Sequence, residues 1–232
     1  MSTAFLRPTG ATGLNNHPLA KSLTSYFAFQ GSGRNFVNSG RSLSAAPYAG
    51  TTDGTALAIP ASYAGATFTD LPNSVGSFSL GLRFNLSNPN IGSSALVTLT
   101  GSAIFTVTTQ YNSLHAGGII IQNITANTWY TLLCTCVVSG SYSLVSAWVN
   151  GQYITGTLST KVSSVTGAVT LGASINSIVR CSALAGFNRV LTASEAVAWT
   201  TDPWCVVRPR RSLWSTPSFR PAWSLAQRRR TA

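Results

Sequence analysis

Apolar and polar residues alternate in the segment Ser77–Leu86. Every even-numbered residue from Phe78 to Leu86 is Phe or Leu, and the residues between them are Ser, Gly, Arg and Asn. A period of two is typical of a strand that buries one face, because successive side chains point to opposite faces of a sheet. The pattern therefore predicts a half-buried strand of an antiparallel sheet.

Other short segments rich in β-branched and aromatic residues recur through most of the chain, separated by Gly, Asn, Asp, Ser and Pro. The Asn150-Gly151 pair between two of them favours a type I′ hairpin turn, since both turn positions need a positive φ. Many short strands without repeats, heptads or alternating helices are typical of a β-sandwich or jelly roll. The further predicted strands are Thr24–Gln30, Thr55–Ile59, Ala95–Thr100, Ala103–Thr109, Gly118–Gln122, Thr128–Val138, Tyr142–Val149, Gln152–Thr155, Val165–Gly172 and Val179–Phe187.

One short helix is predicted after the last strand. Thr192 and Glu195 have the spacing of a capping box, in which each side chain accepts a hydrogen bond from the backbone N–H of the other residue. The helix should run from Ala193 to about residue 199 or 200 and stop at Asp202-Pro203, because proline disfavours a helical residue before it. We interpret the following residues as structural, at the helix ends or sealing the sandwich: Thr192, Glu195, Trp199, Asp202, Pro203 and Trp204.

The order of these motifs resembles a known family. The motifs are S-F-S-L-G-L-R-F, N-T-W-Y-T-L, S-A-W-V-N-G-Q, V-T-L-G-A and A-G-F-N-R-V-L-T-A-S-E, followed by D-P-W and an Arg/Pro tail. They resemble the laminin-G-like, concanavalin A-like lectin domains carried by tailed-bacteriophage proteins, over roughly residues 20–206. The resemblance implies an all-β fold, a two-sheet antiparallel jelly-roll sandwich with one short C-terminal helix and extended terminal arms. It also implies binding of glycans or proteins, and no enzymatic activity.

We divide the chain into an N-terminal arm (1–20), a concanavalin A-like β-sandwich (21–206) and a basic C-terminal attachment tail (207–232). Hydrophobic residues form 44% of the sequence, enough for a large core, whereas charged residues form only 8%. The net charge is +11, and residues 207–232 contain seven arginines and no acid. The N-terminal arm contains no long apolar run, so we expect no membrane insertion.

Three large aromatic residues alternate with arginines in the tail, which a merely solvated tail would not need. Aromatic side chains can dock in pockets while arginines pair with carboxylates or phosphates. We favour docking to a protein over binding to single-stranded nucleic acid, because base-stacking aromatics are usually carried on rigid sheets. The predicted docking residues are Arg208, Arg210, Arg211, Trp214, Phe219, Arg220, Trp223, Arg228, Arg229 and Arg230.

The sequence contains little reactive chemistry. His17 and His115 have no Cys or carboxylate neighbour at the spacing of a triad or a metal site, and His115 is placed in a loop. The only acids before Glu195 are Asp53 and Asp70, whereas Ca²⁺ needs six to eight oxygen ligands. We therefore predict no enzyme, no cofactor and no metal site. The four cysteines are expected to be free, mostly buried thiols.

A sugar-binding surface would combine exposed aromatic residues with amide donors. The candidates for this role are Tyr111, Asn112, Asn150 and Tyr153. Trp129 and Trp148 lie in apolar strands, which favours packing in the core.

Together these features predict a non-enzymatic bacteriophage virion protein, a lectin-like decoration or fibre module attached through its arms. It would be assembled in the host bacterial cytoplasm beside other virion proteins from capsid, neck or tail, as a homo-oligomer. The alternative is a tail fibre or spike lectin that recognises host surface glycans. A weaker alternative is nucleic-acid binding through the arginine-rich tail.

Overall fold

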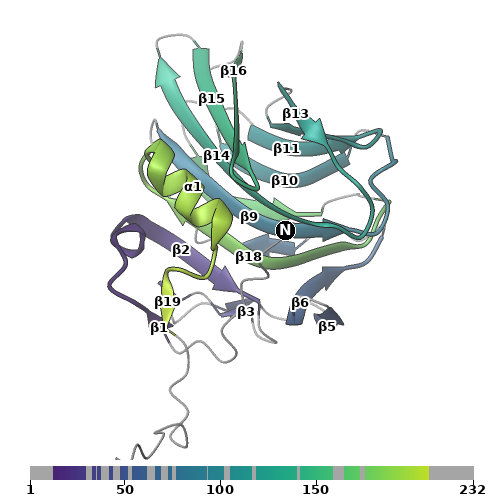
Figure 1. Ribbon diagram of the computed structural model, residues 1–232, viewed down its shortest axis with the longest axis horizontal. Coiled ribbons are helices and arrows are strands. Elements are labelled where there is room, and N and C mark those ends of the chain that lie inside the picture. Colours follow the sequence, from purple (N-terminus) through teal and green to yellow (C-terminus); the bar gives the residue numbers. More distant parts are fainter. Residues whose placement is uncertain are drawn as a thin grey trace, which may run out of the picture.

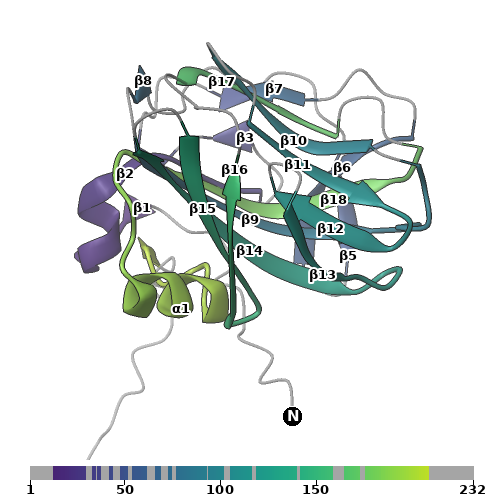
Figure 2. The same ribbon diagram turned by 90° about the horizontal axis from the view of Figure 1, so that it is seen from above.

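The protein is a sandwich of two antiparallel β-sheets with one α-helix packed outside (Figures 1 and 2), which confirms the predicted fold class. The computed structural model describes residues 13–29, 33–34, 36–37, 42–43, 48–51, 54–61, 66–68, 73–74, 77–92, 94–101, 105–116, 119–139, 142–158, 165–172 and 176–208.

The larger sheet has eight strands, and the long strands β14, β9 and β18 form its centre. All pairs are antiparallel, as expected for strands that hairpins and longer connections join. In order across the sheet the strands are β16 (Gln152–Leu158), β15 (Tyr142–Val149), β14 (Trp129–Ser139), β9 (Phe78–Leu86), β18 (Val179–Phe187), β6 (Gly54–Ile59) and β5 (Tyr48–Thr51), and β2 (Leu23–Ala28) also pairs with β18.

The second sheet has seven strands and covers one face of the first. Its order is β13 (Ile119–Asn123), β12 (Ser113–Ala116), β11 (Phe105–Gln110), β10 (Ser94–Gly101), β17 (Val165–Leu171) and β7 (Ala66–Phe68), and β8 (Asn73–Ser74) pairs with β17. The strands β10 and β11 are consecutive in the chain and pair antiparallel. A separate small ladder joins β3 (Gly33–Arg34) to β4 (Ser42–Leu43).

The main core lies between the two sheets. It contains the even-numbered residues of β9, from Phe78 to Leu86, as the alternation predicted. The facing sheet contributes residues such as Leu96 of β10 to this core. The strand next to β9 contributes residues such as Cys134 of β14. Because successive side chains of a strand point to opposite faces, the even-numbered residues of β9 all face this core.

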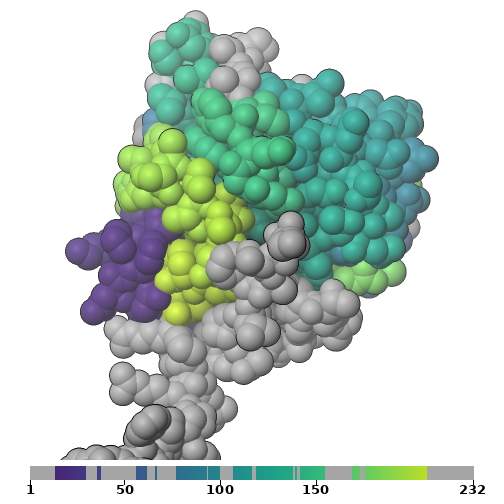
Figure 3. All heavy atoms as spheres, in the orientation of Figure 1, coloured from purple at the N-terminus to yellow at the C-terminus, as the bar shows by residue number. Residues whose placement is uncertain are grey.

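A second core covers the outer face of the eight-stranded sheet. The helix α1 (Ala193–Thr201) and the 3₁₀ helix η1 (Pro18–Ser22) pack there, and their Trp199 and Leu19 side chains are fully buried. Figure 3 shows the yellow-green C-terminal segment and the purple N-terminal segment beside each other on the surface. The strand predicted at Ser77–Leu86 is present, but the expectation that one of its faces is exposed was wrong. Only Arg83 in β9 is more than slightly exposed, because Trp199 covers Gly81, the segment before α1 covers Ser79, and Asn85 is buried beside Arg180.

The indole of Trp199 lies directly on Gly81 of β9. A Cβ added to Gly81 would lie 2.6 Å from Cη2 of Trp199, much closer than van der Waals contact allows. The absence of a side chain at this position lets the helix approach the sheet closely. The small odd-numbered residues of β9 thus form the seat of α1.

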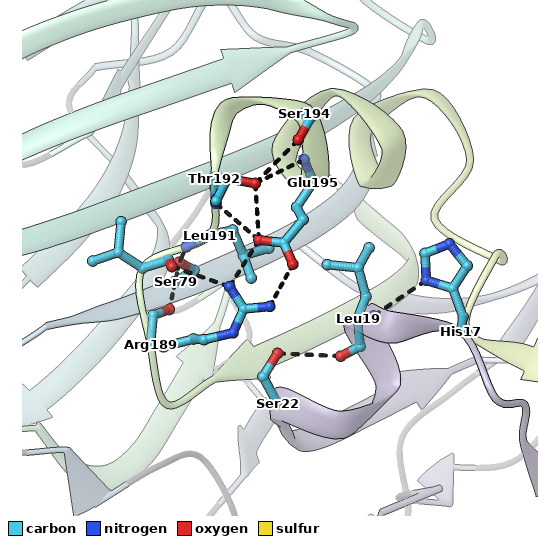
Figure 4. A network of polar contacts seen from close by, with 10 residues as sticks. His17, Leu19, Ser22, Ser79, Arg189, Leu191, Thr192, Ser194 and Glu195 are labelled. Carbon is cyan, nitrogen blue, oxygen red and sulfur yellow. Dashed lines mark hydrogen bonds and ion pairs between the residues drawn. The ribbon is translucent and has the colours of Figure 1, made fainter.

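A network of polar contacts fixes the start of α1 (Figure 4). The capping box of Thr192 and Glu195 is present, and Arg189 donates to both carboxylate oxygens of Glu195, at 2.7 and 2.5 Å. The hydroxyl of Ser79 donates to the Arg189 carbonyl and accepts from the Leu191 amide. The network connects the helix start to β9 through hydrogen bonds as well as apolar contacts.

The two ends of the described chain meet in a short ladder. Strand β1 (Gly13–Leu14) pairs with β19 (Val207–Arg208), and the Asn15 side chain donates to the Cys205 carbonyl at 2.5 Å. Residues 13–20, assigned from the sequence to an N-terminal arm, therefore pack on the sandwich, because Leu19 fills the second core. On the C-terminal side the folded part continues to residue 208.

Replacing Gly81 by alanine should destabilise the fold by about 1–3 kcal/mol, because the new methyl group would push Trp199 away from β9. Urea unfolding of the full chain measures this. Gly92→Ala is the matched control, since a Cβ at Gly92 meets no atom within 4 Å. Equal stability of both variants would show that Trp199 does not pack as described.

Glu195→Gln should lower stability at neutral pH by about 0.5–1 kcal/mol, through loss of the ion pair with Arg189, because glutamine still fits the N3 position of a capping box. The Arg189 guanidinium, with hydrogen bonds from Thr192, lowers the pKa of Glu195 from 4.5 to about 2. The carboxylate therefore stabilises the fold above pH 4.5 and loses this effect as the pH falls towards 2. Thermal unfolding across this window should show a smaller acid-induced loss in Glu195→Gln and Arg189→Gln than in the wild type. Identical pH slopes would contradict the assignment.

Candidate functional site

A polar patch lies on the outer face of the eight-stranded sheet, beyond the part that α1 covers. Its first row crosses three strands, where Arg180 pairs with Asn85 and Asn85 pairs with Trp129. In the second row Arg83 pairs with Thr131. We define the outer-face patch by these rows and the adjoining turns: Arg83, Asn85, Asn127, Trp129, Thr131, Asn150, Tyr153 and Arg180.

The period of two places these rows on the outer face, because the even-numbered residues of β9 face the core. The next row towards α1 contains Gly81 paired with Leu133 and Leu133 paired with Trp148. Trp199 sits on Gly81, and Leu133 and Trp148 are buried in the second core. The rows of Arg83 and Asn85 therefore lie beyond the cover of the helix, whereas Tyr153, which pairs with Trp148, continues the row of Gly81 at its exposed end.

Arg83 is held against Trp129. Its Nη1 donates to the Thr131 hydroxyl at 2.9 Å, and its guanidinium carbon lies 5.3 Å from the centroid of the indole. This cation–π geometry orients the guanidinium on the surface of the sheet. Trp129 is half-buried and lies on the outer face. The prediction that Trp129 packs in the core was wrong. Trp129 pairs with Asn85 and therefore lies on the same face as Arg83, opposite to the face of Phe84.

Arg180 is held by two amide side chains. Its Nη1 donates to Oδ1 of Asn85 at 3.0 Å and to Oδ1 of Asn127 at 3.5 Å. Asn85 is almost fully buried, whereas Asn127 is exposed in the turn before β14, at a φ of 56°. A buried amide that positions a half-exposed guanidinium gives the patch a defined geometry.

The Asn150-Gly151 turn borders the patch. Both residues have positive φ, 49° and 86°, as the type I′ turn predicted there requires. The backbone N–H of Asn150 donates to the Thr131 carbonyl, and its Oδ1 accepts from the Thr131 amide, each at 2.9 Å. The exposed side chain of Asn150 thus sits at the second row and ties the hairpin to β14.

Tyr153 lies on the same face, in β16. It pairs with Trp148, and the two rings are 4.9 Å apart, with a tilt of 43°. The ring remains 56% exposed, and its hydroxyl lies 3.3 Å from that of Ser146. Two of the predicted glycan-binding residues, Asn150 and Tyr153, therefore belong to one surface.

The other two predicted residues, Tyr111 and Asn112, lie in the opposite sheet. They form the turn between β11 and β12, with φ of 47° and 68°. Their amides donate to the carbonyls of Ile91 and Pro89, and Tyr111 is 68% exposed. The structure does not place them in the outer-face patch.

The surroundings of two histidines and two cysteines indicate that these residues have structural roles. His17 caps η1 by accepting from the Leu19 amide, and His115 lies in β12 and not in the loop expected from the sequence, since it pairs with Thr108. Burial raises the pKa of Cys136 to about 11 and that of Cys205 to about 12. These thiols thus stay protonated and unreactive at neutral pH.

In the part of the chain that the structure describes, no three His, Cys, Asp or Glu side chains gather closely enough to hold a metal ion. None of the helices described there is long and apolar enough to cross a membrane. Of the predicted docking residues, Arg208 is described only by its backbone, in β19. Outside the described residues lie Arg210, Arg211, Trp214, Phe219, Arg220, Trp223, Arg228, Arg229 and Arg230.

Comparison with known proteins shows likeness in structure alone. No protein-family model and no curated protein sequence matches the chain. The receptor-binding domain of botulinum neurotoxin type G matches with a TM-score of 0.58 at 14% identity, over 76% of this chain and 50% of that domain. The binding domain of botulinum neurotoxin DC, solved in complex with SialylT, gives 0.57 at 13% identity, over 78% and 52%.

A Trypanosoma rangeli sialidase mutant with trans-sialidase activity also matches, with a TM-score of 0.53 at 13% identity, over 82% of this chain and 34% of the enzyme. The chain thus spans about half the length of the two toxin domains. At these identities the matches show a shared β-sandwich fold.

Proposed function

We propose that this protein is a non-enzymatic, lectin-like module of a bacteriophage particle that binds glycans through the outer-face patch. The observation that carries the proposal is the patch itself, in which guanidinium, indole, phenol and amide groups lie on one face of a rigid sheet. Specific sites for small ligands combine apolar contact area with a few well-placed polar groups in this way. Saccharides offer both apolar C–H faces and hydroxyl groups to such a surface.

The fold likeness supports this proposal. One structural neighbour, the botulinum neurotoxin DC binding domain, is known in complex with SialylT, and a second, from botulinum neurotoxin type C, depends on interaction with two ganglioside molecules for cell entry. The patch residues are held by one another and by backbone groups before any ligand arrives. Such preorganisation reduces the entropy lost on binding.

The placement of the chain ends supports attachment to a larger particle. After β1, which pairs with β19, the chain continues through η1 to Leu23. Leu23 pairs with Phe187, the last residue of β18. Arg180 lies near the start of that same strand. Segments that continue from the ladder could thus join neighbouring virion subunits while the patch stays accessible.

Tyr153→Ala should weaken binding of the full chain to any glycan found on an array by about fivefold, since an aromatic contact contributes on the order of 1 kcal/mol. Tyr111→Asn is the matched control, because it removes another exposed tyrosine, from the other sheet, and asparagine tolerates a positive φ. Loss of binding in Tyr111→Asn alone would move the site to the β11–β12 turn and contradict the proposal.

Removal of residues 209–232 should leave a folded protein that no longer enters phage particles. The described core ends at the β1–β19 ladder, so the melting temperature should stay close to that of the full chain. Particle incorporation during phage assembly is measured by mass spectrometry of purified virions. Normal incorporation of the shortened chain would contradict an attachment role for the tail.

A further inference from the structure

We propose that the outer-face patch binds an internal stretch of a linear polysaccharide, which lies diagonally across β14, β15 and β16 from Trp129 to Tyr153. This inference rests on the proposed glycan-binding function and adds the form of the ligand, a chain of several sugar rings and not a single terminal sugar. It follows from the register of the three strands, from the side chains on the diagonal and from the surroundings of its two ends.

The register of the three strands places Trp129, Asn150 and Tyr153 on one line. Tyr153 of β16 lies in the row of Leu133, which follows Trp129 by four residues in β14. Asn150 lies beside Thr131, halfway between these two rows, and directly follows β15, the strand between β14 and β16. The two aromatic residues are therefore the ends of a diagonal, and the asparagine is its midpoint.

The diagonal is longer than a single sugar. A strand rises about 3.4 Å per residue and neighbouring strands lie about 4.8 Å apart, so this register separates the Cα atoms of Trp129 and Tyr153 by roughly 16 Å. A pyranose ring is similar in width to the ring of tyrosine and can contact only one of the two aromatic side chains. A saccharide that contacts both must therefore contain several linked rings.

The side chains on the diagonal suit the mixed chemistry of a sugar chain, which offers apolar C–H faces and hydroxyl groups. Tyr153 remains 56% exposed while its ring packs on Trp148. Trp129 is half-buried, and the guanidinium of Arg83 orients its ring. Between them the exposed Asn150 holds its Oδ1 on a backbone amide of β14, so Nδ2, on the other arm of the carboxamide, can donate to a sugar hydroxyl.

Both ends of the diagonal allow a longer chain to continue. Beyond Trp129 lies the turn of residues 125–128, in which all four residues are exposed. The Asn127 amide donates to the Leu86 carbonyl at the end of β9, which places this turn on the side away from β16. At the other end, β16 is the outermost strand in the sheet order that the structure describes (Figure 1). A polysaccharide can thus pass over both ends, which a site for a terminal sugar does not require.

The test uses the full chain and linear oligosaccharides of one to six units of glucose, N-acetylglucosamine, mannose or galactose. A glycan array selects the sugar that binds best, and isothermal titration then measures the affinity for each chain length. The affinity should rise by about fivefold or more once the oligosaccharide is long enough to reach the second aromatic ring, and should then stay constant. Chemical blocking of both ends of the hexamer should leave its affinity unchanged, because internal rings make the contacts.

Variants at the two ends of the diagonal locate the ligand. Tyr153→Ala and Trp129→Ala should each abolish the gain in affinity from longer oligosaccharides, since each variant keeps only one aromatic contact. Tyr142→Ala is the matched control and should keep the gain, because Tyr142 is an exposed tyrosine on the same face of β15 but pairs with Ser139, away from the diagonal. Melting temperatures show which variants are folded, and Tyr153→Ala, at the more exposed ring, carries the test alone if Trp129→Ala is unfolded.

The outcomes separate this inference from the function on which it rests. Affinity that does not increase beyond a monosaccharide would overturn the inference and leave the proposed glycan-binding function standing. Loss of binding to the hexamer with blocked ends would also overturn it, in favour of a terminal sugar. A gain with length that survives in the folded end variants would place the chain elsewhere on the protein and overturn it as well. Absence of binding to every oligosaccharide would contradict both.

Discussion

The contact between Trp199 and Gly81 is the constraint on which the outer face of the sandwich depends. An indole can lie flat on β9 only because Gly81 has no side chain, and this close approach seats α1 on the sheet. The helix then buries Leu133, Trp148 and the segment that contains Leu19 in a second core. The helix does not cover Arg83. The contact between Trp199 and Gly81 thus determines which part of this face is buried under α1 and which part stays exposed.

Local sequence signals predicted the elements well. The strand Val179–Phe187 and the hairpin at Asn150-Gly151 are found where expected, because alternation and turn chemistry act over a few residues. The turn at Tyr111 was missed, since tyrosine is not a residue that signals a positive φ. The burial of both faces of β9 was also missed, because it depends on a helix more than 100 residues later in the chain.

The candidate site was only partly visible in the sequence. Asn150 and Tyr153 could be named because exposed amides and aromatic residues near a turn are typical of sugar-binding surfaces. Arg83 and Arg180 come from distant strands, and only the register of β9 with β18 brings them to one place. The signal that was present is the polar side of the alternating strand, where Arg83 is its one charged residue.

The central claim is that α1 leaves open a surface patch that binds a glycan. Amide chemical-shift mapping of the full chain, titrated with the oligosaccharide that binds best on a glycan array, tests this most directly. The account predicts saturable shifts centred on residues 83, 129, 150 and 180. Shifts confined to residues 111 and 112, or no saturable shift at all, would contradict it.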